Sequence, residues 1–414
     1  MKKMKTKIFP FFLIAAMLNS MVMVGFADES SRNSDCLENI EILYRNDSVS
    51  QNGQNADFSP YQGTPVQVLA ESFLPDSTSV QVTDIIDGKT AVITGESGQI
   101  IWEVEVPQDG LYAVNVCYYP VEGHGGTIER HFTVNGEIVS KDFSFLAFNR
   151  IWKDEIDASD FEKDSRGNEI RPSQVESPRW VNLVLSDSTG YQQTPLTISL
   201  TAGVHRIALE SVKEPLAIAY VELVAPQTLL TYDEYSKNIA GKAEATAQYI
   251  EIPAEHALEK SDSSLYAITD RTSPMTNPQD PSKIRLNTIG GSKWQNVGQK
   301  LTWEFYVEQD GYYHIALRFK KDLISGMFAS RSLKIDDEIL FEEVSALRFN
   351  YKGGWQLYDL GDENGTYSFY LEKGSHTVTM EVVLGDVADI LGRTEDCLSR
   401  LNAIYRHILM ITGL

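Results

Sequence analysis

One short segment occurs twice in this chain. Residues Trp102–Tyr112 read WEVEVPQDGLY, and 201 positions later residues Trp303–Tyr313 read WEFYVEQDGYY, with seven of eleven residues identical. Apolar residues alternate with charged ones from Trp102 to Val106, and this period of two is typical of a half-buried strand. Asp109-Gly110 then offers a tight turn. We therefore predict a β-hairpin in each copy, with Trp102 and Trp303 facing the core.

The similarity continues beyond this segment. At the same offset Arg130 aligns with Arg331, and Phe148-Asn149 aligns with Phe349-Asn350. Trp180 then aligns with Trp355 at an offset of 175, so the first copy carries an insertion of 26 residues. A repeat of this length indicates two homologous modules.

Short alternating segments separated by turn residues fill both copies, which predicts a mainly β protein of two antiparallel jelly-roll β-sandwiches. Helix is expected only outside the copies. Residues 231–248 are rich in Ala, Glu and Lys and predict a helical linker, and residues 387–411 have apolar side chains at steps of three or four. This amphipathic helix requires a partner, either the second sandwich or something outside the chain.

The N-terminus has the features of an export signal. Four lysines precede an apolar run from Ile8 to Val24, and Gly25-Phe26-Ala27 offers small residues for cleavage. The alternative is a transmembrane anchor, but Pro10, Asn19 and Ser20 interrupt the run, which favours a cleaved signal peptide. Removal of these lysines takes the formal net charge from −22 to −26, which argues against nucleic acid as a partner. The three cysteines, Cys36, Cys117 and Cys397, allow at most one disulfide. We expect Cys117 to lie outside the deep core, either as a free thiol or paired with Cys36.

Several motifs carry a family resemblance. The segments VLAES and IPAEH, WEVEVPQDGLYAV, FTVNGE, KGGWQLY and LTAGVHRIAL together resemble the galactose-binding-like carbohydrate-binding modules. A narrower resemblance, in YYPVEG, DPSKIRLNTIGG and LNAIYRHILMITG, is to the N-terminal region of large extracellular solute-binding proteins of sugar importers in Gram-positive bacteria. Those proteins continue into a two-lobed binding domain, which this sequence does not include.

The resulting predicted organisation has six parts. They are a signal peptide (1–27), an N-terminal linker (28–63), a first β-sandwich (64–226), a helical linker (227–248), a second β-sandwich (249–385) and a C-terminal helix (386–414).

Sugar binding needs flat aromatic side chains against the C–H face of a pyranose, with polar groups around its rim. The resemblance implies a stacking role for Trp355 in the Gly-Gly-Trp segment, and the internal alignment extends it to Trp180. Trp294, in the polar segment GGSKWQ, and Tyr358, shortly after Trp355, are further candidates. For each, the alternative is that the side chain only packs a loop in place.

The insertion of the first copy mixes Trp152 with Arg150 and Arg171, a combination of an aromatic group and planar donors that suits a polar ligand. A solvated acidic flap is the alternative. The family resemblance also implies structural calcium, with Glu71 and Glu255 as ligands, because the Glu of the Ala-Glu start binds the ion in that family. An acidic partner near the last strand of the first copy is missing, since Ala219 stands there.

The sequence has no Gly-x-Ser-x-Gly elbow, His-Glu-x-x-His motif or phosphate-binding loop, so no enzyme activity is expected. The resemblance implies a secreted, cell-surface protein that binds an oligosaccharide or cell-wall glycan in connection with sugar uptake by an ABC importer. The alternative is an assembly or spacer protein whose C-terminal helix recruits a permease or a solute-binding partner.

Overall fold

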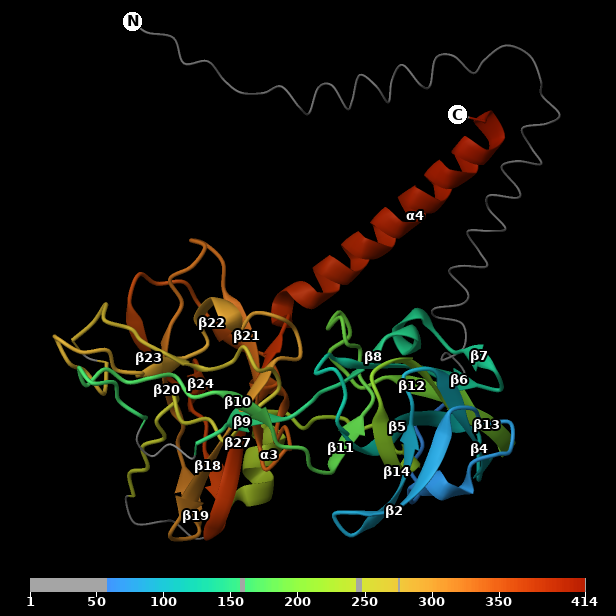
Figure 1. Cartoon of the computed structure of the whole chain (residues 1–414), viewed down its shortest axis with the longest axis horizontal. Helices are drawn as coiled ribbons and strands as arrows, with labels where there is room; N and C mark the ends of the chain where they lie inside the picture. The colour runs from blue at the N-terminus through green and yellow to red at the C-terminus, as the bar shows by residue number, and fades with distance from the viewer. Residues whose placement is uncertain (1–57, 157–160, 243–247, 275, 414) are drawn as a thin grey trace, which may run out of the picture. The chain divides into compact units, whose positions relative to one another are not determined.

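The structure is a computed structural model that describes residues 58–413, except 157–160, 243–247 and 275. Residues 1–57, which include Cys36 and the predicted signal peptide, lie outside the described part. In the described part, antiparallel strands predominate (Figure 1). No helix in these residues has the length and apolarity needed to cross a membrane.

The first sandwich consists of two antiparallel sheets. The first sheet has the order β11-β5-β14-β3-β2, with β1 on β14 and β12 on β5, and the second has the order β4-β13-β6-β7, with β8 on β6. The strands of the two sheets are β1 (Val66–Leu69), β2 (Val80–Ile86), β3 (Lys89–Thr94), β4 (Gly98–Val106), β5 (Gly110–Tyr119), β6 (Ile128–Val134), β7 (Glu137–Ile138), β8 (Leu146–Phe148), β11 (Val181–Val184), β12 (Thr197–Leu200), β13 (Gly203–Lys213) and β14 (Leu216–Val224).

The second sandwich is built from a larger sheet, β10-β9-β15-β18-β27-β21-β22, and four strand pairs, β16-β17, β19-β26, β20-β23 and β24-β25. Their bounds are β9 (Trp152–Asp154), β10 (Gln174–Glu176), β15 (Glu259–Lys260), β16 (Ala267–Ile268), β17 (Thr288–Ile289), β18 (Lys300–Val307), β19 (Gly311–Tyr313), β20 (Ala316–Lys320), β21 (Ala329–Ile335), β22 (Leu347–Phe349), β23 (Trp355–Asp359), β24 (Gly361–Asp362), β25 (Gly365–Thr366), β26 (Phe369–Leu371) and β27 (Gly374–Val383).

The repeated segment is not the hairpin that the sequence predicted. Strand β4 pairs with β13 and strand β5 pairs with β14, β11 and β12, so the chain passes from one sheet to the other between them. The same change of sheet separates β18, which pairs with β27, from β19, which pairs with β26. Alternation cannot distinguish the two arrangements, because both strands of a sheet-to-sheet corner also point apolar residues into the shared core.

The aspartate of each corner has a specific partner. Asp109 Oδ1 accepts a hydrogen bond from the Ala202 N–H at 2.7 Å, and Asp310 Oδ1 accepts one from the Lys373 N–H at 2.6 Å. Asp109 therefore fixes the turn before β13, the partner strand of β4, and Asp310 fixes the turn before β27, the partner strand of β18. Neither of these two bonds closes the turn in which the aspartate itself stands. The repeat is conserved between the copies because the same corner is built twice.

The two tryptophans of the repeat are core residues, as the sequence predicted. Trp102 is 0% exposed and Trp303 is 6% exposed. The Trp102 indole N–H donates to the Ala70 carbonyl at 3.1 Å, and the Trp303 indole N–H donates to the Ala254 carbonyl at 2.9 Å. Each tryptophan thus joins the start of its module to the core and satisfies its only donor.

The helices differ in part from the prediction. In the described part of the expected helical linker, helix α3 covers Tyr232–Ile239, and it begins at a capping box between Thr231 and Glu234. Tyr235 and Ile239 are buried in the core of the second sandwich, so α3 belongs to that module. Helix α4 spans Ala388–Thr412 and ends at Gly413, whose φ of 69° gives the left-handed cap.

The insertion of the first copy extends the sheet of the second sandwich. Its strands β9 and β10 pair with each other, and β9 joins β15 through Trp152 and Lys260. Lys260 is 1% exposed, and its Nζ lies 2.6 Å from Asp154 Oδ1 and 2.9 Å from the Gln174 side-chain oxygen. The insertion therefore adds a hairpin to the edge of the second sheet. Its Asp154 provides the carboxylate that pairs with the buried Lys260 ammonium group.

Cys117 is fully buried on β5, but it is not part of the core cluster of the first sandwich, in line with the prediction for its face of the sheet. It is buried on the other face by side chains that include Lys89, whose Nζ lies 3.4 Å from the Cys117 Sγ. Among the described residues, Cys117 and Cys397 form no disulfide, and the pairing with Cys36 falls outside them.

Candidate functional site

Strands β20 and β23 carry the candidate site of the second sandwich. They are antiparallel, with Lys320 opposite Trp355 and Arg318 opposite Leu357. Opposed residues of an antiparallel pair share a face, so these four side chains lie on the same side of the pair. Leu357 is 70% exposed, which identifies this side as the solvent face.

Two cationic side chains of β20, Arg318 and Lys320, neighbour Trp355. The guanidinium carbon of Arg318 lies 5.9 Å from the ring centroid, within the range of a cation–π contact. Lys320 Nζ lies 2.9 Å from Asp270 Oδ2, 3.0 Å from the Thr272 hydroxyl and 3.0 Å from Asp322 Oδ2. Burial lowers the pKa of Lys320, but these carboxylates outweigh it and leave the pKa above its ordinary value. Lys320 is thus a cation held by these groups on the strand position opposite Trp355.

Two features distinguish Trp355 from a tryptophan that only anchors a loop. Its indole N–H is buried and has no hydrogen-bond partner in the described structure. The two residues before it, Gly353 and Gly354, have no atom within 4 Å of the position where a Cβ would stand. An unpaired buried donor is costly to a fold and is satisfied when an acceptor from a ligand or a water reaches it.

Trp180 occupies the matching place in the first sandwich. It directly precedes β11, whose Val181 pairs with Tyr118, and its ring lies 5.5 Å from that of Tyr119. Lys89 Nζ is 5.4 Å from the Trp180 ring centroid. Here, however, the indole N–H is already used, because it donates to the Ile86 carbonyl at 2.8 Å. The two sites share a position, and only the second has a spare donor.

Tyr220 and Asn182 complete the surroundings of Trp180. The Tyr220 hydroxyl donates to Asn182 Oδ1 at 3.0 Å, and Lys89 Nζ lies 5.7 Å from the Tyr220 ring centroid. Burial, followed by the neighbouring Cys117 thiol, raises the pKa of Tyr220 to about 12, so its hydroxyl stays a neutral donor.

Two other predicted aromatic residues point toward the core of the second sandwich. Tyr358 packs edge-on against Phe319 and Phe349 and belongs to the margin of that core. Trp294 also packs there, its N–H donates to the Gln299 carbonyl at 3.1 Å, and the Arg331 guanidinium covers its ring at 4.4 Å. Tyr358 therefore packs strand β23 against this core, and Trp294 holds its loop in place.

Two of the insertion residues contact residues of the second copy. Trp152 is half-buried on β9, in the strand that extends the second sheet. Arg171 is exposed, and its guanidinium lies 3.9 Å from the Tyr266 ring centroid, so it stacks on a residue of the second copy. Their ligand-binding role stays a prediction.

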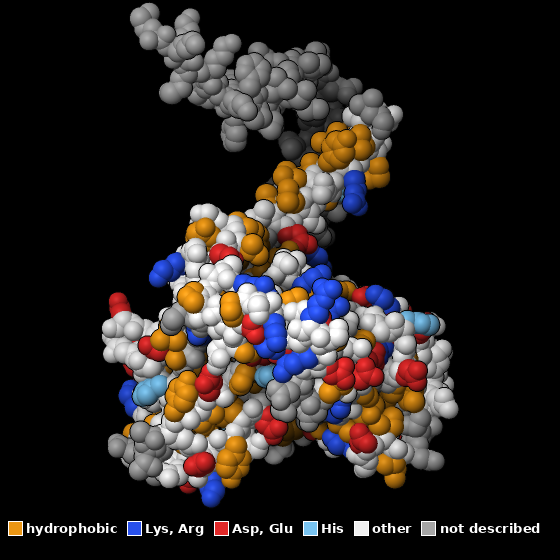
Figure 2. All heavy atoms as spheres, turned by 60° about the vertical axis from the view of Figure 1, so that its left-hand side comes forward, with side chains coloured by type: hydrophobic (Ala, Val, Ile, Leu, Met, Phe, Trp, Pro, Cys, Tyr) orange, Lys and Arg blue, Asp and Glu red, His pale blue; other side chains and the backbone are white. Residues whose placement is uncertain are grey.

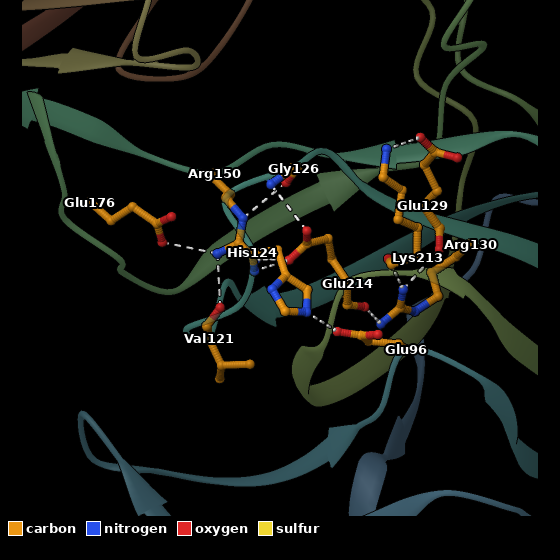
Figure 3. A network of polar contacts seen from close by, with 10 residues as sticks. All are labelled: Glu96, Val121, His124, Gly126, Glu129, Arg130, Arg150, Glu176, Lys213 and Glu214. Carbon is orange, nitrogen blue, oxygen red and sulfur yellow. Dashed lines mark hydrogen bonds and ion pairs between the residues drawn. The ribbon is translucent and has the colours of Figure 1, made fainter.

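Arg150 lies at the centre of a buried network (Figure 3). Its guanidinium donates to the Gly126 and Val121 carbonyls at 3.0 and 2.8 Å, to Glu176 Oε2 at 2.9 Å and to Glu214 Oε2 at 2.8 Å. The Arg150 and Glu214 side chains are 2% and 3% exposed. Every nitrogen of this guanidinium is engaged, so the contacts within the fold account for Arg150 without a ligand.

Glu214 is the hydrogen-bond partner of the glycine-rich segment EGHGG, residues 122–126. Its carboxylate accepts hydrogen bonds from the His124 and Gly126 N–H groups at 2.8 and 3.1 Å, so the glycine-rich loop wraps around a buried carboxylate. Burial raises the pKa of Glu214, but these N–H groups and Arg150 outweigh it and bring the pKa below its ordinary value. The loop therefore cradles an anion that belongs to the protein itself.

The residues implied as calcium ligands are in different environments. Glu71 is exposed in a short 3-10 turn, whereas Glu255 is 4% exposed. Within the described residues, no group of three or more His, Cys, Asp or Glu side chains is placed to hold a metal ion. Calcium takes six to eight oxygen ligands, so the side chains around either glutamate do not fit this ion by themselves. Calcium binding stays a prediction.

Glu255 gives a prediction about pH. Burial raises its pKa from 4.5 to about 7, so between these values the unfolded chain loses this proton before the folded chain does. The contribution of Glu255 to the free energy of unfolding is therefore fully present below pH 4.5 and is lost as the pH rises to 7. The loss amounts to about 3 kcal/mol at most. We expect Glu255→Gln to remove this loss, as measured by urea unfolding between pH 5 and 8.

The exposed counterpart provides the control for that experiment. Glu71→Gln makes the same change at the matching exposed position of the other copy and serves as the control variant. A Glu255→Gln protein whose stability still falls between pH 5 and 7 would contradict the assignment. The same variants test calcium: if Glu255 binds the ion, added Ca²⁺ raises the melting temperature of the parent chain and not that of Glu255→Gln.

The sequence pattern proposed Trp355 and Trp180 as candidates but not the neighbours that the structure places beside them. Arg318 and Lys320 align with Cys117 and Tyr119 at the offset of 201, so the internal alignment could have placed them beside the tryptophans once strand pairing was known. Asp270 comes from a loop far away in the sequence, and no pattern in the chain connects it with Lys320.

Comparison with known proteins found structural similarities that each cover less than half of the chain. No protein-family model matches the sequence, and no curated protein matches it. Among solved structures, the chain is similar to the C-terminal CBM6 of LamC, a laminarinase from Zobellia galactanivorans, with 16% identity, a TM-score of 0.22, and coverage of 39% of this chain and 99% of that one.

A family 35 carbohydrate-binding module from Clostridium thermocellum is similar with 19% identity, a TM-score of 0.23, and coverage of 39% of this chain and 99% of that one. The GH26-CBM35 β-(1,4)-mannanase of Podospora anserina is similar with 14% identity, a TM-score of 0.25, and coverage of 44% and 36%. At these TM-scores the likenesses decide nothing about the ligand of this chain. The strand pairing described above establishes its β-sandwich fold.

Proposed function

We propose that this protein is a non-catalytic carbohydrate-binding protein and that the solvent face around Trp355 binds the glycan. The observation that carries the proposal is the spare indole N–H of Trp355 beside open space at Gly353 and Gly354. The resemblance of the doubled motifs to carbohydrate-binding modules supports it, and so does the matching position of Trp180 in the first copy.

The chemistry of the site suits a polyhydroxylated ring. The indole offers an apolar surface for the C–H face of a pyranose and one N–H donor at its edge. Arg318 and Lys320 can donate to ring hydroxyls, and the carboxylates that hold Lys320 can accept from them. An apolar plate with donors and acceptors at its margin is the combination that distinguishes a sugar from a purely apolar ligand.

A binding experiment with matched variants tests the proposal. Calorimetry against oligosaccharides and cell-wall glycans, chosen from a glycan array, should detect a ligand for the parent chain. Trp355→Ala should weaken binding by about tenfold or more, equivalent to about 1.4 kcal/mol. Trp294→Phe, which alters a tryptophan with a packed ring and a paired N–H, serves as the control and should bind as the parent does.

Two results would overturn the assignment. If folded protein binds no glycan, carbohydrate recognition is wrong for this chain. If Trp180→Ala abolishes binding and Trp355→Ala does not, the first sandwich carries the site. Circular dichroism of each variant separates loss of binding from loss of fold.

We further propose that the protein is exported and acts at the surface of a Gram-positive cell in sugar uptake. The lysine-rich start with its apolar run supports export, and the resemblance to importer-associated solute-binding proteins supports uptake. Recruitment of a permease or solute-binding partner by the C-terminal helix rests on that resemblance alone. Finding importer permease genes beside this gene would support the uptake role, and their absence would weaken it.

A further inference from the structure

Helix α4 has an apolar stripe that is exposed in the described structure. Figure 2 shows apolar side chains along this helix. Leu391, Leu398, Leu401 and Tyr405 are 42–60% exposed, and Ile411 is 74% exposed. One flank of the stripe is covered in the first turns, because Gly392 lies against Tyr191 and Glu395 bonds Lys141 at 3.0 Å. The stripe itself lies beside this flank and is exposed.

The stripe follows a seven-residue repeat. With Leu391 as position a, the a and d positions are Leu391, Thr394, Leu398, Leu401, Tyr405, Ile408 and Thr412, and the g positions are Ile390, Cys397, Ile404 and Ile411. A repeat of seven over three heptads keeps one seam in line along a helix, which is the requirement for packing against another helix.

We propose that this stripe pairs with α4 of a second copy of the chain, in antiparallel orientation. Antiparallel helices place a positions opposite d positions. In the symmetric register Leu398 lies opposite Leu401 of the second copy, and Leu391 lies opposite Ile408. This register aligns residue 387 with residue 412 of the other copy, so both helices overlap over their full length.

Side-chain volumes favour the antiparallel arrangement. In this register the small Thr394 lies opposite the large Tyr405 of the other copy, and this occurs twice by symmetry. A parallel pair would instead place two tyrosines in one layer and two threonines in another, so one layer would be overfilled and the other underfilled. Matched volumes fill the seam evenly.

Charge favours the same arrangement. Residues 388–399 contain Asp389, Glu395, Asp396 and Arg393, for a net charge of −2, whereas residues 400–412 contain Arg400 and Arg406, for a net charge of +2. Antiparallel pairing sets each acidic half against a basic half. Parallel pairing would join like halves and would also bring together the starts of two chains' helices, each attached to a protein with a net charge of −22.

Sedimentation of the chain, processed by an exporting host, tests the pairing. We expect a dimer in reversible equilibrium with monomer, because a seam of three heptads is short. Leu398→Glu with Leu401→Glu should give a monomer at every concentration. Ser399→Glu with Ala403→Glu adds the same charge on the same turns outside the stripe, and this control should remain a dimer.

Disulfide formation tests the orientation. In the antiparallel register Cys397 lies beside Ile404 of the other copy, so Ile404→Cys should give a covalent dimer under mild oxidation, whereas the parent chain should not. A parent chain that forms a covalent dimer through Cys397 as readily as Ile404→Cys would contradict the antiparallel register and overturn the proposal. A parent chain that stays monomeric would also overturn it, because residues before Phe58 or a different protein would then cover the stripe.

The outcome does not depend on carbohydrate binding. Trp355→Ala should leave the monomer–dimer equilibrium unchanged, and the stripe variants should keep the affinity of a single site for a soluble oligosaccharide. A dimer would hold two copies of each sandwich, so only binding to a multivalent glycan surface should weaken in the stripe variants.

Discussion

Replacing Arg150 with alanine is expected to lower the free energy of unfolding of the first sandwich by about 3–5 kcal/mol, because the change leaves the buried Glu214 carboxylate without its cation. The Arg150 and Glu214 side chains are 2% and 3% exposed, so water cannot replace the lost partner. The loop that wraps around Glu214 also loses the two carbonyl contacts of Arg150. Urea unfolding followed by tryptophan fluorescence measures the effect.

Arg171→Ala is the matched control for that experiment. Its guanidinium is exposed and stacks on Tyr266, and such a contact contributes about 0.5–1 kcal/mol. Arg150→Lys keeps the charge but cannot make the same set of contacts, so we expect an intermediate loss. If Arg150→Ala unfolds like the parent chain but loses glycan affinity, Arg150 binds ligand and the network is not what holds the fold.

Replacing Lys260 with alanine is expected to cost about 3 kcal/mol and to release the β9-β10 hairpin from the second sheet, because Asp154 then stays buried without a cation. The Lys260 and Asp154 side chains are 0% and 10% exposed. Burial lowers the pKa of Lys260, and Asp154 opposes that effect, so the folded state depends on this pair being formed. Hydrogen exchange at residues 152–154 and 174–176 measures the release.

Two variants make the Lys260 result interpretable. Arg179 bonds Glu259 next to Lys260, but its side chain is 44% exposed, so Arg179→Ala should cost less than about 1 kcal/mol. Lys260→Met combined with Asp154→Leu replaces both charges by apolar groups and should recover most of the loss. Unchanged exchange in Lys260→Ala would show that strand pairing alone holds the hairpin.

Strand periodicity predicted the right class of fold for a physical reason. Alternation marks which side of a strand meets the core, and it located Trp102 and Trp303 correctly. It carries no information on which strand is the neighbour, so the corner between β4 and β5 was mistaken for a hairpin. In a sandwich both strands of such a corner point apolar residues into the same core, and only the hydrogen-bond partners separate the two cases.

The same limit applies to the candidate site residues. Residue type alone placed Arg150, Arg171 and Trp152 in one ligand loop, since planar donors near an aromatic residue suit a polar ligand. The structure directs Arg150 to Glu214 and Arg171 to Tyr266, each far away in sequence. The partner of a long cationic side chain is set by tertiary contacts, and a local pattern cannot identify it.

Residue pattern and internal alignment were enough to predict a doubled module, a core in each copy and an amphipathic helix after the second copy. These features depend on neighbours along the chain and on an internal alignment, both of which the residues record. The fold was needed to show that the insertion extends the second sheet, that Trp180 uses its N–H where Trp355 does not, and that Glu214 is enclosed by a loop. Each of these depends on groups brought together across long separations in sequence, where burial and hydrogen-bond geometry select the partner.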